Sequence, residues 1–265
     1  MKIIKKDAKS IFTKTRLPGA DFVINQYVGC EHNCKYCYAK FISRWKDYGE
    51  WGTWVEVKQN APELVKGNYV KGEIFMSSIS DAYQPIEKKF KLTRRILKNL
   101  DKRTKLSILT KSDLVLRDMD LFKKFKGISV GLTISGFEGQ VKRMLEPGSS
   151  THKQRLEALK TLNKNGINNY AFVSPIIPGL TDVKKIIREV KGFTDYFWFE
   201  VLNLRGAGEK FNNLLKKDFP NSYGIMTDRK KFIVFIEELK RIIKAEKIKT
   251  VGIEIHFPAW KTIKI

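Results

Sequence analysis

Three cysteines lie within eight residues, and the chain contains no other cysteine. Cys30, Cys34 and Cys37 belong to the segment GCEHNCKYCYA and have the spacing C-x3-C-x2-C. In a cubane iron–sulfur cluster each iron takes one external ligand, which is usually a thiolate. Three thiolates leave one iron open, and reactive metal sites keep an open position, as catalytic zinc sites do. The spacing therefore predicts an iron–sulfur centre that a substrate or cofactor completes.

Two other interpretations of the thiols stay open at this point. A zinc site made of the three cysteines and His32 would require a histidine inside the loop to reach round to the metal. Three thiols without a ligand would be exposed in a polar loop and open to oxidation. The open cluster fits the spacing better than either of these.

The cysteine loop follows the first of seven short apolar segments that alternate with amphipathic helical patterns. Near-continuous apolar runs are typical of parallel strands that are covered on both faces. Strand, helix and strand at regular spacing predict right-handed βαβ units, and hence an α/β fold with a partial (β/α)6 TIM-like barrel. The loops after the strands, including the cysteine loop, should form the active end of that barrel. The expected strands cover residues 22–28, 73–78, 106–110, 128–135, 170–177, 196–204 and 251–257.

The chain shows no internal linker or low-complexity tract, so one domain over residues 1–265 is expected. Its core should cover about 20–205, and 206–265 should complete the barrel on the substrate side. The aromatic-rich segment 48–69 is expected to be either part of the first helix connection or a lid.

The charge balance suggests a polyanionic partner but does not establish one. The net charge is +23, with 51 Lys and Arg against 28 Asp and Glu, and such a field attracts nucleic acid. A lysine-rich host proteome would give the same balance, and the lysines are spread over solvated helix faces. Neither a signal peptide nor an apolar run of membrane-spanning length is visible, so a cytoplasmic protein is expected. Few, clustered cysteines agree with a reducing compartment.

The cysteine loop resembles that of the radical S-adenosylmethionine (SAM) superfamily, whose signature is C-x3-C-x-aromatic-C, with Tyr36 as the aromatic residue. Four further blocks resemble the branch related to spore photoproduct lyase (DNA repair photolyase-like): SSISDAYQPIEKKFKLTRRIL, ILTKSDLVLRDMDLF, LEPGSSTHKQRLEALKTLNKNGI and SPIIPGLTD. The resemblance implies that Cys30, Cys34 and Cys37 hold a [4Fe-4S] cluster and that SAM binds its open iron. One electron, from a donor such as ferredoxin or flavodoxin, would then cleave SAM to methionine and a 5′-deoxyadenosyl radical.

The resemblance also implies a set of SAM-binding positions. Ser80 and Asp81 offer acceptors to the methionyl ammonium, and Lys111 offers a cation to its carboxylate. Turn and cap chemistry, packing of Tyr36, or simple solvation of Lys111 would account for the same residues without a cofactor. The remaining implied positions are Thr133 as a polar contact, Tyr36, Tyr38 and Ile177 around the adenine, and Arg155, which would meet Glu146 or the cofactor carboxylate.

The chain departs from the lyase at the hydrogen donor. The lyase uses a cysteine outside the cluster, and the matching position here is Ser78, so Tyr27 and Tyr83 become the candidate replacements. A purely structural role is the alternative for each side chain expected to face the substrate. These are Glu200, Asn203, Arg205, His256 and Trp260.

Three functions remain as alternatives. The first is a radical SAM enzyme of lyase or transferase type, monomeric, that acts on DNA, RNA or a nucleotide. The second has the same chemistry on a small metabolite or peptide. The third is a metal-containing nucleic-acid-binding protein without enzymatic activity. A basic groove with aromatics at the cluster mouth would favour the first, a small closed cavity the second, and a tetrahedral metal without a SAM pocket the third.

Overall fold

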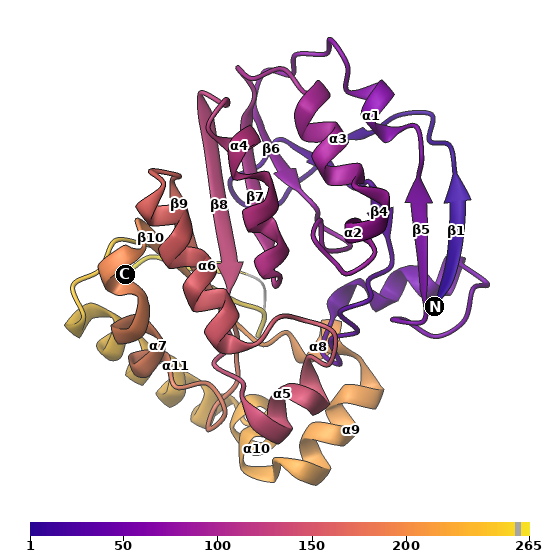
Figure 1. Cartoon of the computed structure of the whole chain (residues 1–265). Helices are drawn as coiled ribbons and strands as arrows, with labels where there is room; N and C mark the ends of the chain where they lie inside the picture. The colour runs from indigo at the N-terminus through magenta and orange to yellow at the C-terminus, as the bar shows by residue number, and fades with distance from the viewer. Residues whose placement is uncertain (258–260) are drawn as a thin grey trace.

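The computed structural model describes residues 1–257 and 261–265. At its centre lies a sheet with the strand order β12-β11-β10-β9-β8-β7-β6-β3-β2 (Figure 1). Strand β2 (Phe12–Lys14) lies antiparallel at one edge and β12 (Lys261–Ile263) at the other, and in the described chain these edges do not pair. The seven strands between them are parallel: β3 (Phe22–Ile24), β6 (Glu73–Met76), β7 (Lys105–Thr110), β8 (Gly127–Thr133), β9 (Asn169–Ile176), β10 (Tyr196–Val201) and β11 (Thr250–Ile255).

The open parallel sheet confirms the predicted fold class, with each of the seven expected strands in place. Two strands end three or more residues before the predicted end, and the other strand ends lie within two residues of the prediction. The strand expected over 22–28 divides, because Tyr27 and Val28 leave the main sheet and pair with another strand. The strand expected over 196–204 ends at Val201, since the Asn203 side chain accepts a hydrogen bond from the amide of Gly206 (2.8 Å) and begins a helix.

Helix α6 (His152–Lys164) contacts strands β8 and β9 of the sheet, and α7 (Val183–Val190) contacts β9. In α7 the buried residues are Val183, Ile186, Ile187 and Val190, which is the spacing of one helical face. The 3-10 helices are η1 (Tyr38–Trp45), η2 (Asp113–Asp118) and η3 (Lys191–Phe193). The α-helices are α1 (Ala61–Leu64), α2 (Glu87–Phe90), α3 (Leu92–Asn99), α4 (Met119–Phe122), α5 (Gly139–Leu145), α6 (His152–Lys164), α7 (Val183–Val190), α8 (Leu204–Ala207), α9 (Glu209–Asp218), α10 (Pro220–Thr227) and α11 (Arg229–Ala245).

A second, small sheet lies beside the main one (Figure 1). Strand β5 (Trp54–Lys58) pairs in parallel with β1 (Lys2–Lys6) and antiparallel with β4 (Tyr27–Val28). The segment 48–69 is therefore a strand and a short helix, α1, and the expectation of a lid is wrong. Its apolar side chains pack behind the cysteine loop, where fully buried Trp54 belongs to one cluster with Cys30 and Ile42.

The carboxyl ends of the parallel strands face a group of short helices. Strand β8 points toward the side of the molecule where α5, α8, α9 and α10 lie (Figure 1). Across residues 1–257 and 261–265, none of the helices has the length and apolar composition of a membrane span.

Candidate active site

A cavity of about 520 Å³ opens at the carboxyl ends of the strands. The three thiols line one part of it, together with Tyr36 and Tyr38. Residues of β6 to β11 and of the segments that follow these strands line most of the remainder, and Leu17 and Pro18 also line it. The fold thus brings the cysteine loop and six strand ends to one hollow, as expected for a barrel of this type.

The cysteine loop is held in place by a distant turn that follows α5. The amide of Lys35 donates to the carbonyl of Leu145 (2.9 Å), and the amide of Gly148 donates to the carbonyl of His32 (3.1 Å). The contact is so close that a β-carbon on Gly148 would lie 2.3 Å from the carbonyl oxygen of Glu31. Only glycine fits this position, which explains part of the LEPGSS block.

The three thiols are largely shielded from solvent and lie near a cation. Cys30 and Cys34 are buried and Cys37 is half-buried. Burial raises the pKa of the Cys34 thiol to about 12, although the nearby cation Lys111 acts in the opposite direction. Among the described residues, no three His, Cys, Asp or Glu side chains converge to hold a single metal ion.

His32 lines the same cavity as the thiols and lies against Asp81. Its Nδ1 lies 3.3 Å from Oδ2 of Asp81, and the imidazole is buried. This contact engages only Nδ1, and metal-bound histidines commonly have such a carboxylate partner on the other ring nitrogen, so it does not argue against the zinc site of three cysteines and His32. What tells against that site is that, in the part of the chain that the structure describes, the thiols and His32 do not converge on a single metal position. The thiols fit a group that takes one thiolate at each of three separate positions within one cavity.

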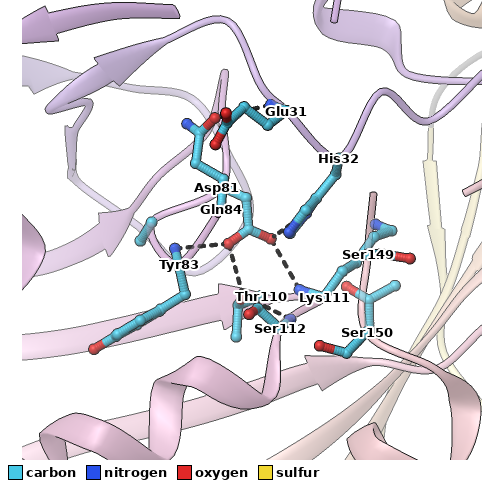
Figure 2. Close-up of polar contacts among 12 residues, drawn as sticks. Glu31, His32, Asp81, Tyr83, Gln84, Thr110, Lys111, Ser112, Ser149 and Ser150 are labelled. Atoms are coloured by element: carbon cyan, nitrogen blue, oxygen red, sulfur yellow. Dashed lines mark hydrogen bonds and ion pairs between the residues drawn. The ribbon is translucent and has the colours of Figure 1, made fainter. Parts of the chain in front are cut away.

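Asp81 is the centre of a hydrogen-bonded cage (Figure 2). Its Oδ1 accepts from the hydroxyl of Thr110 (2.6 Å) and from the amide of Tyr83 (2.8 Å). Its Oδ2 accepts from the amide of Lys111 (2.9 Å) and faces His32. Burial alone would raise the pKa of Asp81, but His32 and Thr110 lower it to about 2. Asp81 lines the cavity, and its carboxylate links the cysteine loop, through His32, to β7, through Thr110.

Lys111 lies over the ring of Tyr36, with its Nζ 5.8 Å from the ring centroid. Burial alone would lower the pKa of Lys111, but the neighbouring Cys34 and Glu146 raise it. The residue lines the cavity beside the thiols. Lys111 is therefore not simply solvated, which is the alternative that the sequence left open. Its ammonium group is held in place and lines the cavity as a positive charge.

A buried ion pair lies behind this lysine. The Arg155 guanidinium donates to Glu146, to the hydroxyl of Ser149 (2.6 Å) and to the carbonyl of Thr133 (2.9 Å). The hydroxyl of Tyr36 also donates to Glu146. Burial would raise the pKa of Glu146, but Arg155 and Lys111 lower it to about 2. Of the two partners expected for Arg155, Glu146 is the one it contacts, and Arg155 does not line the cavity.

The hydroxyl side chains in the predicted set have partners of their own. Ser80 donates to the carbonyl of Tyr27 (3.0 Å), and Ser78 exchanges hydrogen bonds with the amide side chain of Asn25. The hydroxyl of Tyr38 donates to the carbonyl of Ser78. All of these hydroxyl groups and Thr133 belong to residues that line the cavity.

Several predicted residues lie elsewhere. The Tyr27 hydroxyl donates to Glu87 (2.5 Å) in a buried network, and Tyr83 packs against the Arg117 guanidinium, 5.8 Å from its ring centroid. Neither tyrosine lines the cavity, so both are misplaced as hydrogen donors. Ile177 is buried behind Ser174 and Pro175, which line the cavity in its place. Arg205 lines a neighbouring hollow, and Trp260 falls outside the described residues.

The part of the cavity formed by β9, β10 and β11 carries a hydrogen-bonded chain. The Ser174 hydroxyl donates to Oε2 of Glu200 (2.7 Å), and Oε1 of Glu200 lies 3.0 Å from Nε2 of His256. The structure brings the predicted residues Glu200, Asn203 and His256 together here.

Sequence reasoning missed Trp198 and Glu254, which also line this part of the cavity. The signal for both of them was the alternation of strand side chains. Trp198 lies two residues before Glu200 on β10, and Glu254 lies two residues before His256 at the end of β11, so each pair shares a face. Trp198 donates from its indole nitrogen to Glu254 (3.3 Å).

The chain is similar to several known proteins. It is 56% identical to an uncharacterized protein of Methanocaldococcus jannaschii, over 97% of this chain and 98% of that protein. It is 28% identical to an uncharacterized protein of Mycobacterium tuberculosis, over 64% of this chain and 54% of that protein. Its fold is similar to that of spore photoproduct lyase complexed with dinucleoside spore photoproduct, with a TM-score of 0.66 at 16% identity, over 94% of this chain and 80% of the lyase.

The sequence model of the Radical SAM superfamily matches residues 24–190, which is more than half of the chain. The matched range contains the three thiols, Lys111 and the buried pair behind it. The parallel sheet and the position of the cavity agree with the same family. The chain belongs to the radical SAM superfamily and is a radical SAM enzyme.

Proposed function

We propose that Cys30, Cys34 and Cys37 hold a [4Fe-4S] cluster, that SAM completes it, and that the enzyme acts on a nucleic acid or nucleotide. One observation carries this proposal. The three thiols and the Ser174–Glu200–His256 chain line the same cavity. A cofactor held at the thiols and a substrate held at β9 to β11 would therefore share one cavity.

The residues beside the thiols suit the polar groups of SAM. When bound, the cluster and SAM supply a 5′-deoxyadenosyl radical through one-electron reduction. Lys111 presents a cation to a carboxylate, and the buried Glu146–Arg155 pair keeps its surroundings fixed. Asp81 acts through Lys111 and Thr110 as a positioning residue, because its acceptors are already engaged. Tyr38 and Pro175 offer surfaces on which an adenine ring would pack.

The opposite part of the cavity suits a nucleobase. Phe172 and Trp198 both line it, in an edge contact with centroids 5.5 Å apart, and give an aromatic wall. Each carboxylate oxygen of Glu200 has one partner among the described residues, Ser174 or His256, whereas each oxygen of Asp81 has two. Glu200 can therefore also accept from the N–H groups on the edge of a base. A structurally similar variant of spore photoproduct lyase holds AdoMet and a dinucleoside spore photoproduct together. The net charge of +23 agrees with a polyanionic substrate.

The reaction proposed here does not include the lyase's cysteine relay. The sequence has no fourth cysteine, and Ser78 in its place shares hydrogen bonds with Asn25. We therefore propose hydrogen abstraction from a nucleic acid or nucleotide without a protein thiol as the return donor.

Isotope transfer tests the substrate. The reconstituted enzyme would be incubated with SAM, a reductant and fully deuterated DNA, RNA or nucleotides, and 5′-deoxyadenosine would be analysed by mass spectrometry. Deuterium in 5′-deoxyadenosine is expected from at least one of these substrates, and Glu200→Gln should reduce it. Deuterium transfer from a deuterated small-metabolite or peptide pool, with none from the nucleic acids and nucleotides, would contradict the proposed substrate class.

A further inference from the structure

A second hollow of about 630 Å³ adjoins the active-site cavity. It lies between η1, α8 and the beginning of α9, and the contacts between η1 and α8 bring these elements side by side. Tyr38 and Asn203 line both hollows. A molecule bound in the cavity could therefore continue past these two residues into the second hollow.

The second hollow is basic. Lys40, Arg44, Arg205 and Lys210 line it, against one acidic residue, Glu209. Within the described residues Arg44 and Arg205 make no ion pair or side-chain hydrogen bond, and both are exposed. Guanidinium groups bind phosphate through paired N–H donors, and two of them without partners in the described chain line this one concave site.

Aromatic rings accompany these charges. Tyr38 is 47% exposed and Phe41 is 41% exposed, and both line the hollow. Trp45, 71% exposed, packs edge-on against Phe41 with centroids 5.7 Å apart. Exposed rings beside cations are the combination by which proteins bind single-stranded nucleic acid, since bases stack on the rings while cations follow the backbone.

We propose that this hollow binds the phosphodiester next to the nucleotide held in the cavity, with Arg44 and Arg205 on the phosphate and Phe41 under the neighbouring base. The inference rests on the proposed nucleic-acid function and adds the site of backbone recognition. An acidic electron-donor protein is a competing occupant of a basic surface. The concave shape and the shared residues Tyr38 and Asn203 favour the substrate's own backbone.

Binding measurements on the full-length reconstituted enzyme test this site. The variant Arg44→Gln/Arg205→Gln would be compared with Arg229→Gln/Arg241→Gln, which removes two exposed arginines from α11. The probes are a single-stranded oligodeoxynucleotide, an abasic phosphodiester chain of equal length, and tripolyphosphate, each titrated at several salt concentrations. Cluster absorbance confirms that each variant is loaded and folded.

The first variant should bind both chains at least about tenfold more weakly, because each arginine loses a charged hydrogen bond. Its slope of log affinity against log salt should be smaller by about 0.7, since both arginines contact one phosphate and each phosphate neutralised on a single strand contributes about 0.7. The α11 variant should bind as the wild type does. Phe41→Leu should weaken the oligonucleotide about tenfold and leave the abasic chain unchanged.

The contradicting outcomes separate this site from the proposed function. Wild-type oligonucleotide binding that is unchanged in Arg44→Gln/Arg205→Gln would overturn the site and leave the nucleic-acid function standing. A wild type that binds neither chain would overturn the site and the nucleic-acid arm of the proposed function, and retained binding of tripolyphosphate would then indicate a nucleotide or another small phosphorylated substrate. Loss of flavodoxin-dependent reduction, with oligonucleotide binding intact, would assign the hollow to the electron donor.

Discussion

At the scale of single residues, the site is organised by buried charges that have complete sets of partners. Asp81 and Glu146 each hold several hydrogen bonds from segments that are distant in sequence. Both carboxylates therefore hold Lys111 and the cysteine loop in place, and the ammonium group of Lys111 faces the cavity. The sequence could indicate that these residues gather at one edge of the sheet. It could not predict which neighbour donates a hydrogen bond to which carboxylate oxygen.

Glu146→Gln should lower the free energy of unfolding at pH 7 by about 3 kcal/mol, because Arg155 is left buried without its counter-charge. Glu146 has a folded pKa near 2, below the ordinary value of about 4.3. The contribution of ionised Glu146 to the free energy of unfolding is therefore complete above a pH of about 4.3 and is lost as the pH falls toward 2. Urea unfolding at pH 7 and pH 3 measures both effects. Exposed Glu157→Gln is the control, and equal stability of the two variants would contradict the role of the pair.

Glu200→Gln should reduce substrate-dependent formation of 5′-deoxyadenosine by about 10- to 100-fold, because a charged acceptor for Ser174 and His256 is lost. Iron content and cleavage of SAM without substrate should stay at wild-type values. A parallel loss of bound iron would place Glu200 in the cofactor site and contradict its assignment to the substrate.

At the scale of elements, the cysteine loop depends on parts of the chain that lie far away in sequence. The turn after α5 holds its backbone, and the β5 residue Trp54 packs behind it. Apolar runs and helical spacing were enough to predict the seven parallel strands. They could not predict that Tyr27 and Val28 join a second sheet, because that choice depends on the partner strand β5.

Gly148→Ala should weaken the loop, since the new β-carbon would lie 2.3 Å from the Glu31 carbonyl oxygen and force one segment to move. We expect about 1–3 kcal/mol of destabilisation and faster loss of bound iron. Thermal unfolding and iron retention during dilution measure these two effects. Gly192→Ala is the matched control, because its β-carbon would meet open space. Identical behaviour of the two variants would contradict the bracing contact.

At the scale of the whole molecule, we propose that residues 1–265 form one cooperative domain. The small sheet carries Trp54 in the cluster that includes Cys30, so it is joined to the active end through the loop itself. Unfolding of the apoprotein in urea should therefore give coincident transitions by tryptophan fluorescence and far-ultraviolet circular dichroism. A fluorescence transition at distinctly lower urea would show that the small sheet unfolds by itself.

The central claim is that three thiolates hold a cluster with one position open to SAM. The most direct measurement is electron paramagnetic resonance of the anaerobically reconstituted and reduced protein, recorded with and without SAM. We predict about four irons per chain, a reduced-cluster signal that changes when SAM is added, and loss of this signal in Cys34→Ala. A protein that takes up zinc in place of the cluster, or a signal that SAM leaves unchanged, would contradict the account.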